Sequence, residues 1–227
     1  YSQDALRAGT IIPFNKPADW TSFDVVNKLR RITKIKKIGH AGTLDPFATG
    51  VLIVCFGKAT KRVVQLMELE KEYFGTIELG KETDTHDVTG TIVQEKPLSQ
   101  LPEKIDIEKV LSKFQGQIQQ VPPMYSALKI KGQKLYTLAR KGKIVEREPR
   151  LVEISEITLL DMQNTELQIR VTCSKGTYIR ALARDIGREL GCGGYLKSLV
   201  RRRIGFYTLD HAHELAAFEE EFKKHNP

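Results

Sequence analysis

The sequence predicts an α+β fold, with a central mixed, mainly antiparallel sheet that is flanked by helices and loops. Segments with alternating apolar and polar residues are numerous, helical segments are few, and the two kinds do not alternate regularly as in βαβ folds. The 227 residues are 41% hydrophobic and 28% charged, which is typical of a globular protein. No repeat or low-complexity linker divides the sequence, so we expect residues 1–227 to form a single domain.

The first half of the chain begins with a short strand around residues 11–14, which leads into a Lys-Pro turn. A hydroxyl residue and an acid at capping-box spacing then precede apolar residues at helical spacing, so residues 22–33 are predicted to form a helix. Residues 51–56 form a continuous apolar run that suits a buried strand or a buried helix, because periodicity does not separate the two. Residues 71–79 alternate in polarity and predict a strand.

The second half contains two predicted helices, with a pair of strands between them and a polar turn before them. In chain order, these elements are a turn at 83–90, a short strand near Ile92, a helix over 103–114, strands over 151–160 and 167–173, and a helix over 177–190. The last helix is amphipathic, because its apolar residues share one side. The glycines that follow it are typical of a helix C-cap and a turn.

The chain is basic, since 36 Lys and Arg residues against 28 Asp and Glu residues give a net charge of +8. Basic residues gather at 28–37, 129–143 and 201–203, and such clusters among apolar residues are typical of surfaces that contact nucleic-acid phosphates. The residues after Leu209 are instead acidic and are expected to form a tail. The charge therefore indicates either a polyanionic partner or simply a basic enzyme.

Three cysteines, Cys55, Cys173 and Cys192, lie far apart and form no C-x-x-C pair, so neither a disulfide framework nor a cysteine zinc site is predicted. The longest apolar run, at residues 51–56, is far shorter than the ~20 residues that cross a bilayer. The first residues show no signal peptide. We expect a cytoplasmic protein without a membrane anchor.

The segment from Gly39 to Gly50 carries the strongest sign of a functional loop. Three glycines and a proline within it indicate a special backbone conformation, and the loop presents His40 and Asp45 directly after the first basic cluster. Loops hold a disproportionate share of functional residues. The alternative is that Asp45 only begins a turn, as Asp before Pro commonly does.

Arg180 lies where a predicted strand turns into a helix, within the first turn of that helix. Arg184 and Arg188 follow at intervals of four residues and share its face. Because the helix dipole disfavours a cation in the first turn, we expect a carboxylate to face Arg180. Asp45 is one candidate for that carboxylate.

Asp84, His86 and Asp87 form the strongest competing cluster, because two carboxylates and an imidazole could hold a metal ion. Their place in a polar turn favours local side-chain hydrogen bonds instead.

Five motifs in order resemble those of the tRNA pseudouridine-55 synthase family, of the bacterial pseudouridine synthase B type. They are Asn15-Lys16-Pro17 with Trp20-Thr21-Ser22, the loop from Gly39 to Gly50, Lys71-Glu72-Tyr73, the segment from Pro123 to Lys129, and the segment from Ser174 to Arg180. The resemblance implies a pseudouridine-synthase fold. It also implies an isomerase (an intramolecular transferase) that converts a T-loop uridine of tRNA, at position 55, to pseudouridine by base flipping, without a cofactor or metal.

The resemblance also implies roles for individual residues. Asp45 matches the carboxylate that forms a covalent intermediate, Tyr73 the tyrosine that stacks on the target uracil, and Arg180 the arginine that pairs with the aspartate. The other matches place His40 in the space left by the flipped nucleotide and Leu199 in the pocket wall. Tyr178, Lys16 and Lys129 are matched to contacts with the substrate. Arg201 and Arg202 are expected at the RNA because they belong to the third basic cluster. Attack of Asp45 on the uracil ring and attack on ribose C1′ are both compatible with the sequence.

We therefore expect tRNA, through its T stem-loop, to be the partner of a monomer that needs no second protein. Relatives often carry an additional C-terminal RNA-binding domain, which is not evident here because the chain ends soon after Leu209. Either this lineage lacks that domain or the sequence is part of a longer chain.

Two other functions stay open. One is a non-enzymatic RNA binder or tRNA-folding helper in which Asp45 is structural. The other is a metal-dependent nucleic-acid hydrolase that uses Asp84, His86 and Asp87.

Overall fold

The computed structural model describes residues 1–98, 100–126, 129–130, 133–139, 142 and 145–226. The chain forms two compact units: unit 1 comprises residues 1–73 and 199–227, and unit 2 comprises residues 74–198. Each unit is described by itself. That residues 1–227 act as one catalytic domain stays a prediction.

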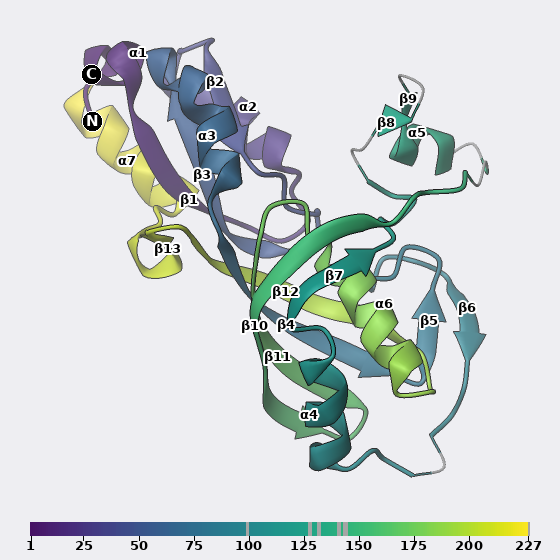
Figure 1. Ribbon diagram of the computed structural model, residues 1–227. Coiled ribbons are helices and arrows are strands. Elements are labelled where there is room, and N and C mark those ends of the chain that lie inside the picture. Colours follow the sequence, from purple (N-terminus) through teal and green to yellow (C-terminus); the bar gives the residue numbers. More distant parts are fainter. Residues whose placement is uncertain (99, 127–128, 131–132, 140–141, 143–144, 227) are drawn as a thin grey trace. The chain divides into compact units, whose positions relative to one another are not determined.

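Within the described residues, nine strands belong to one sheet (Figure 1). They are β1 (Ile11–Lys16), β2 (Ile38–Ala41), β3 (Thr49–Phe56), β4 (Lys71–Leu79), β7 (Gly116–Gln120), β10 (Arg150–Gln163), β11 (Glu166–Cys173), β12 (Gly194–Ile204) and β13 (Tyr207–Thr208). The order is β1-β3-β12-β4-β11-β10-β7, with β2 on β3 and β13 on β12. β3 and β12 pair in parallel, whereas β1–β3, β2–β3, β7–β10, β10–β11 and β12–β13 are antiparallel. The predicted α+β class with a mixed, mainly antiparallel sheet is confirmed.

Two small hairpins and the helices complete the described elements. The hairpins are β5 (Lys81–Thr83) with β6 (Ile92–Glu95), and β8 (Lys129–Ile130) with β9 (Gln133–Lys134). The α-helices are α1 (Gln3–Gly9), α2 (Ser22–Thr33), α3 (Val63–Glu68), α4 (Lys104–Ser112), α5 (Leu135–Ala139), α6 (Ile179–Glu189) and α7 (Leu215–His225), and the 3₁₀ helices are η1 (Gly57–Arg62) and η2 (Leu209–His211). The predicted helix over 22–33 is confirmed, and so is its capping box between Thr21 and Asp24.

The core of unit 1 lies on both faces of β3. Phe14, Leu52 and Phe56 pack with α2 and α7 on one face, and Val51 and Ile53 pack on the other. A strand that is buried on both faces has apolar residues at successive positions and no alternation. This explains why the pattern of residues 51–56 did not distinguish a strand from a helix.

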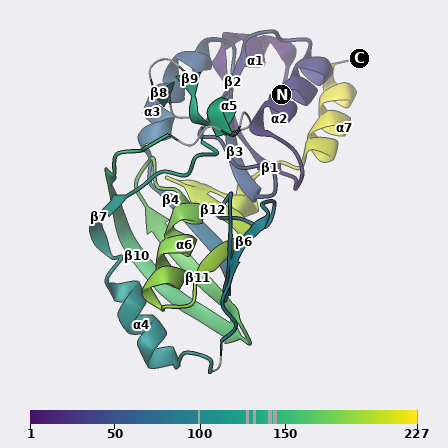
Figure 2. The same ribbon diagram turned by 90° about the vertical axis from the view of Figure 1, so that its right-hand side faces the viewer.

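The predicted acidic C-terminal tail is wrong, because these residues form helix α7, which lies beside α2 (Figure 2). Leu215, Phe218 and Phe222 recur at helical spacing and are buried. Glu219 forms ion pairs with Lys28 of α2 and with Lys223. The acidic residues therefore belong to a helix whose apolar face is packed in the core.

In unit 2, α6 packs closely against the start of β12. A Cβ added at Gly187 of α6 would lie 2.3 Å from Gly193 C and Gly194 N, so only glycine permits this approach. Gly191 and Gly193 both have a φ of +77°, which confirms the predicted turn after the helix.

The three cysteines are free and buried. Burial raises the pKa of the Cys55 thiol to about 11. Of the helices that the structure describes, none is long and apolar enough to span a membrane.

Candidate active site

Asp45 lies half-buried in unit 1, in the loop that joins β2 to β3. Gly42 gives this loop a φ of +85°, and the amide of Ala48 donates to the carbonyl of Asp45 at 3.1 Å. The hydroxyl of Ser22, the first residue of α2, accepts from the amide of Leu44 at 2.9 Å. The capped start of α2 therefore holds the residue before Asp45.

Lys16 supports the same loop from β1. Its ammonium group is buried and donates to the carbonyl oxygens of Pro17 at 2.8 Å, Trp20 at 2.6 Å and Pro46 at 3.0 Å. Burial lowers the pKa of Lys16 to about 8, and the carboxylate of Asp45 is the strongest of the influences that oppose this shift. Lys16 therefore fixes the backbone beside Asp45, and its expected place toward the substrate stays a prediction.

Arg201 supports the loop from β12. Its side chain is only 1% exposed and donates to the carbonyls of Val51 at 2.7 Å, Gly42 at 3.0 Å and Thr43 at 3.4 Å. A Cβ at Gly50, whose φ is +108°, would lie 2.3 Å from the carbonyl oxygen of Arg201, so glycine is needed there. Arg201 therefore supports the loop, and its expected place toward the RNA stays a prediction.

Four other expected site residues also lie in unit 1. Tyr73 on β4 and Leu199 on β12 are buried. Arg202 is more exposed and forms an ion pair with Asp210 at 3.3 Å. His40 lies on β2, and burial, followed by the charge of Arg201, lowers the pKa of its imidazole.

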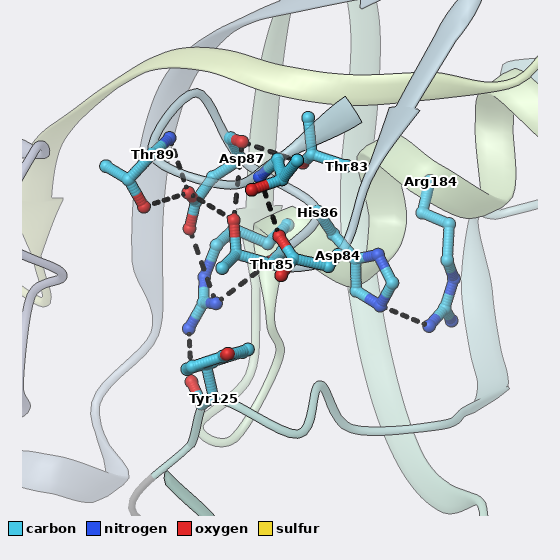
Figure 3. Close-up of polar contacts among 10 residues, drawn as sticks. Thr83, Asp84, Thr85, His86, Asp87, Thr89, Tyr125 and Arg184 are labelled. Atoms are coloured by element: carbon cyan, nitrogen blue, oxygen red, sulfur yellow. Dashed lines mark hydrogen bonds and ion pairs between the residues drawn. The ribbon is translucent and has the colours of Figure 1, made fainter. Parts of the chain in front are cut away.

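Arg180 is held in unit 2, at the start of α6. Its guanidinium lies 3.4 Å from Oδ2 of Asp87, and it donates to the carbonyls of Thr85 at 3.1 Å and Tyr125 at 2.8 Å (Figure 3). Arg180 is 4% exposed, so its charge is buried among these acceptors. The expectation that a carboxylate faces Arg180 is correct, and in unit 2 this carboxylate is Asp87.

In the polar turn at 83–90, the carboxylates of Asp84 and Asp87 accept hydrogen bonds from nearby residues of the same segment. Oδ1 of Asp87 accepts from the amide of Thr89 at 2.9 Å and from the hydroxyls of Thr85 and Thr89, and Oδ1 of Asp84 accepts from the amide of Thr91 at 2.8 Å. These contacts confirm the predicted local hydrogen bonds. Among the residues that the structure describes, no three His, Cys, Asp or Glu side chains are grouped to hold a metal ion.

Gln120 is a site residue that sequence reasoning missed. Its buried amide accepts from the amide of Tyr178 at 2.9 Å and donates to the carbonyl of Tyr178 at 3.1 Å. The last residue of β7 thus fixes the N-cap of α6, one residue before Ile179 and two before Arg180. No pattern in the sequence marks this pairing, because 58 positions separate the partners.

The segment from Pro123 to Lys129 is described only in part. Lys129 begins β8, but its side chain and residues 127 and 128 lie outside the described part, as do several residues of the second basic cluster. Because Asp45 lies in unit 1 and Arg180 in unit 2, the expected pairing between them stays a prediction.

The sequence matches a known protein family. Residues 30–179 match the family model described as TruB family pseudouridylate synthase (N terminal domain). The chain belongs to the TruB family. The matched TruB segment includes both Asp45 and the first residue of α6.

Curated TruB relatives are similar over most of this chain. A protein of Parabacteroides distasonis named tRNA pseudouridine synthase B is 51% identical over 209 residues, which are 89% of this chain and 88% of that protein. The protein of the same name from Bacteroides fragilis is 49% identical over 221 residues, covering 95% of this chain and 94% of the relative.

Solved structures share the fold of this TruB chain. A chain in the structure titled "Crystal Structure of a Cbf5-Nop10-Gar1 Complex" aligns with a TM-score of 0.76 and 29% identity, over 97% of this chain. Another, titled "Structure of H/ACA RNP bound to a substrate RNA containing 2'-deoxyuridine", aligns with a TM-score of 0.73 and 27% identity. This chain spans 56% and 57% of the lengths of those two chains.

Proposed function

We propose that this protein is a tRNA pseudouridine synthase that isomerises the T-loop uridine at position 55. The observation that carries the proposal is the Asp45 loop, held by Ser22, Lys16 and Arg201, in a chain that is 51% identical over 89% of its length to a protein named tRNA pseudouridine synthase B.

The reaction is an isomerisation in which no atom is gained or lost. The bond between ribose C1′ and uracil N1 breaks, the base turns, and a bond between C1′ and C5 forms. The proton on C5 is lost and N1 gains a proton. An ionised carboxylate at Asp45 supplies the nucleophile that such covalent catalysis needs.

The other residues are assigned to binding and orientation. Tyr73 stacks on the uracil, Arg180 pairs with the catalytic carboxylate, Leu199 lines the pocket, and His40 fills the space that the flipped nucleotide leaves. Extracting a base costs a few kcal/mol, and stacking on an aromatic ring recovers about 1–3 kcal/mol. Tyr178, Lys129 and Arg202 are assigned to contacts with the RNA.

The tRNA is bound through the shape and phosphates of its T arm, because structured RNA is recognised mainly by shape, stacking and backbone contacts. The net charge of +8 favours such a partner. Action as a monomer in the cytoplasm, without a second protein, belongs to the same proposal. Light scattering of the purified protein with and without tRNA tests the oligomeric state.

The decisive experiment maps pseudouridine on unmodified tRNA that has been incubated with this protein alone. We expect conversion at position 55 with the wild type and none with Asp45→Asn, while Asp45→Asn still binds the tRNA. The matched control is Asp19→Asn, because Asp19 is an exposed acid whose φ of +62° asparagine also adopts.

Three outcomes separate the alternatives. Wild-type turnover by Asp45→Asn contradicts the catalytic assignment. Binding without conversion by the wild type favours the RNA-binding helper. Cleavage of the RNA that stops on addition of a chelator favours the hydrolase.

A further inference from the structure

His86 is the strained residue of the turn at 83–90. Its φ is +62°, in the left-handed region that residues with a Cβ seldom adopt. Its amide donates to the carbonyl of Thr83 at 3.1 Å, and its carbonyl accepts from the amide of Leu196 at 3.0 Å. The backbone of His86 is therefore fixed in this conformation, and strain of this kind is often retained where a side chain must be aimed.

The side chain of His86 points out of the turn toward α6 (Figure 3), where Nε2 lies 3.2 Å from Nη1 of Arg184. A guanidinium has no acceptor, so Nε2 must accept and Nδ1 must carry the proton. Nδ1 is buried on the side of the ring away from Arg184. The imidazole is therefore held in the tautomer that accepts from Arg184.

The charges around His86 keep this acceptor neutral. Burial, and then the positive charges of Arg184, Arg180 and Arg188, lower the pKa of His86 to about 4. The acids nearby are already engaged: Asp87 with Arg180, Asp185 with Arg184, and Glu82 with Arg188.

Three arginines of α6 hold successive parts of one segment. Arg188 binds the carboxylate of Glu82, with contacts of 2.6 and 2.9 Å, and Arg184 binds His86. Arg180 contacts Asp87 and the carbonyl of Thr85. Residues 85 and 87, which flank His86, are therefore among the residues that hold Arg180, together with Tyr125.

We propose that His86 is a positioning residue for pseudouridine formation: by accepting from Arg184, it fixes residues 85–87 and thereby the guanidinium of Arg180. The proposal rests on the proposed function and on the role assigned there to Arg180. The His86–Arg184 contact joins the turn to α6 beside the contacts that Arg180 makes with Asp87 and Thr85.

The test compares His86→Gly with His86→Gln. Glycine removes the imidazole and also relieves the positive φ, so the folded state is retained. We expect His86→Gly to lower kcat about tenfold, with KM and the Kd for tRNA within about twofold of wild type, which is the pattern of a lost transition-state interaction. His86→Gln keeps an acceptor near the position of Nε2 and is expected to recover most of kcat.

Arg184→Met completes the design. If the two residues act through one contact, the double variant His86→Gly/Arg184→Met is no slower than the slower single variant. Multiplying losses, or full kcat in His86→Gly, would overturn the proposal.

Hydrogen exchange at the Leu196 amide gives a readout that needs no activity. The acceptor of this amide is the carbonyl of residue 86, which His86→Gly keeps but no longer fixes through the contact with Arg184. We therefore expect faster exchange in His86→Gly than in wild type and His86→Gln; unchanged exchange contradicts the proposal. If the wild type makes no pseudouridine but its Leu196 amide exchanges more slowly than that of His86→Gly, only the proposed function is contradicted.

Discussion

The carboxylate of Asp87 serves two partners with its two oxygens: Oδ1 closes the polar turn through Thr85 and Thr89, and Oδ2 lies 3.4 Å from Nη1 of Arg180. The turn and the arginine are therefore set by the same side chain. Because Asp87 and Arg180 are both at least 95% buried at the side chain, with 5% and 4% exposed, their charges depend strongly on each other.

Asp87→Asn is expected to destabilise the protein by about 3 kcal/mol, because breaking a buried ion pair leaves the arginine charge less compensated. Urea unfolding measures this free energy. Asp84→Asn is the matched control in the same turn, since Asp84 is exposed and its replacement keeps an acceptor for the Thr91 amide. An equal loss in both variants would show that the turn, rather than the ion pair, carries the effect.

Lys16→Met is expected to change how stability depends on pH. The pKa of Lys16 falls from 10.5 to about 8 on folding, so between these values the unfolded chain holds a proton that the folded chain has released. The contribution of Lys16 to the free energy of unfolding therefore rises with pH across this window. The free energy of unfolding is measured for both proteins from pH 7 to 10.5. We expect that of the wild type to rise with pH relative to that of Lys16→Met. Parallel curves would contradict the lowered pKa.

Phe218→Ala is expected to cost about 3–5 kcal/mol of stability, because a large buried side chain is replaced by a cavity. Phe218 is 1% exposed and contacts the rings of Phe14 and Phe222. Phe206, which is 74% exposed, provides the control, and Phe206→Ala should change stability by less than about 0.5 kcal/mol. Chemical denaturation of the two variants decides whether α7 is part of the core.

The affinity for tRNA is expected to fall steeply with salt, because phosphate contacts release counterions. Lys36→Gln with Lys37→Gln, at exposed positions of the first basic cluster, should reduce the slope of log K against log salt by about 1–2. Lys223→Gln removes a charge that pairs with Glu219 on α7 and should leave the slope unchanged. A flat salt response of the wild type would contradict phosphate-dominated binding.

The sequence predicted those elements whose patterns are local. The capping box of α2, the alternation of β4 and the glycines of the Asp45 loop each reflect a rule that acts over a few residues. Strand β12 was missed because Lys197, Arg201 and two further arginines hide its alternation. In the structure these charged side chains have partners that are distant in sequence: Lys197 pairs with Glu78 and Glu166, and Arg201 donates to three carbonyls.

The same limit applies to the candidate site. The special backbone around Asp45 was predictable from its glycines and proline. The supports of that loop were not, because Lys16 and Arg201 bind carbonyl oxygens, which carry no signature in a sequence. The helix dipole predicted that a carboxylate would face Arg180. That this carboxylate is Asp87 depends on how the turn at 83–90 packs on α6, which the sequence does not show.

The burial of every native cysteine makes the chain suited to labelling at one introduced thiol. Burial raises the pKa values of Cys55 and Cys192, so both stay protonated at neutral pH, and Cys173 is 1% exposed. A maleimide dye would therefore attach selectively to Phe206→Cys on the exposed turn before β13. Such a fluorophore would occupy one defined position on an otherwise unaltered protein, with no need for a cysteine-free background.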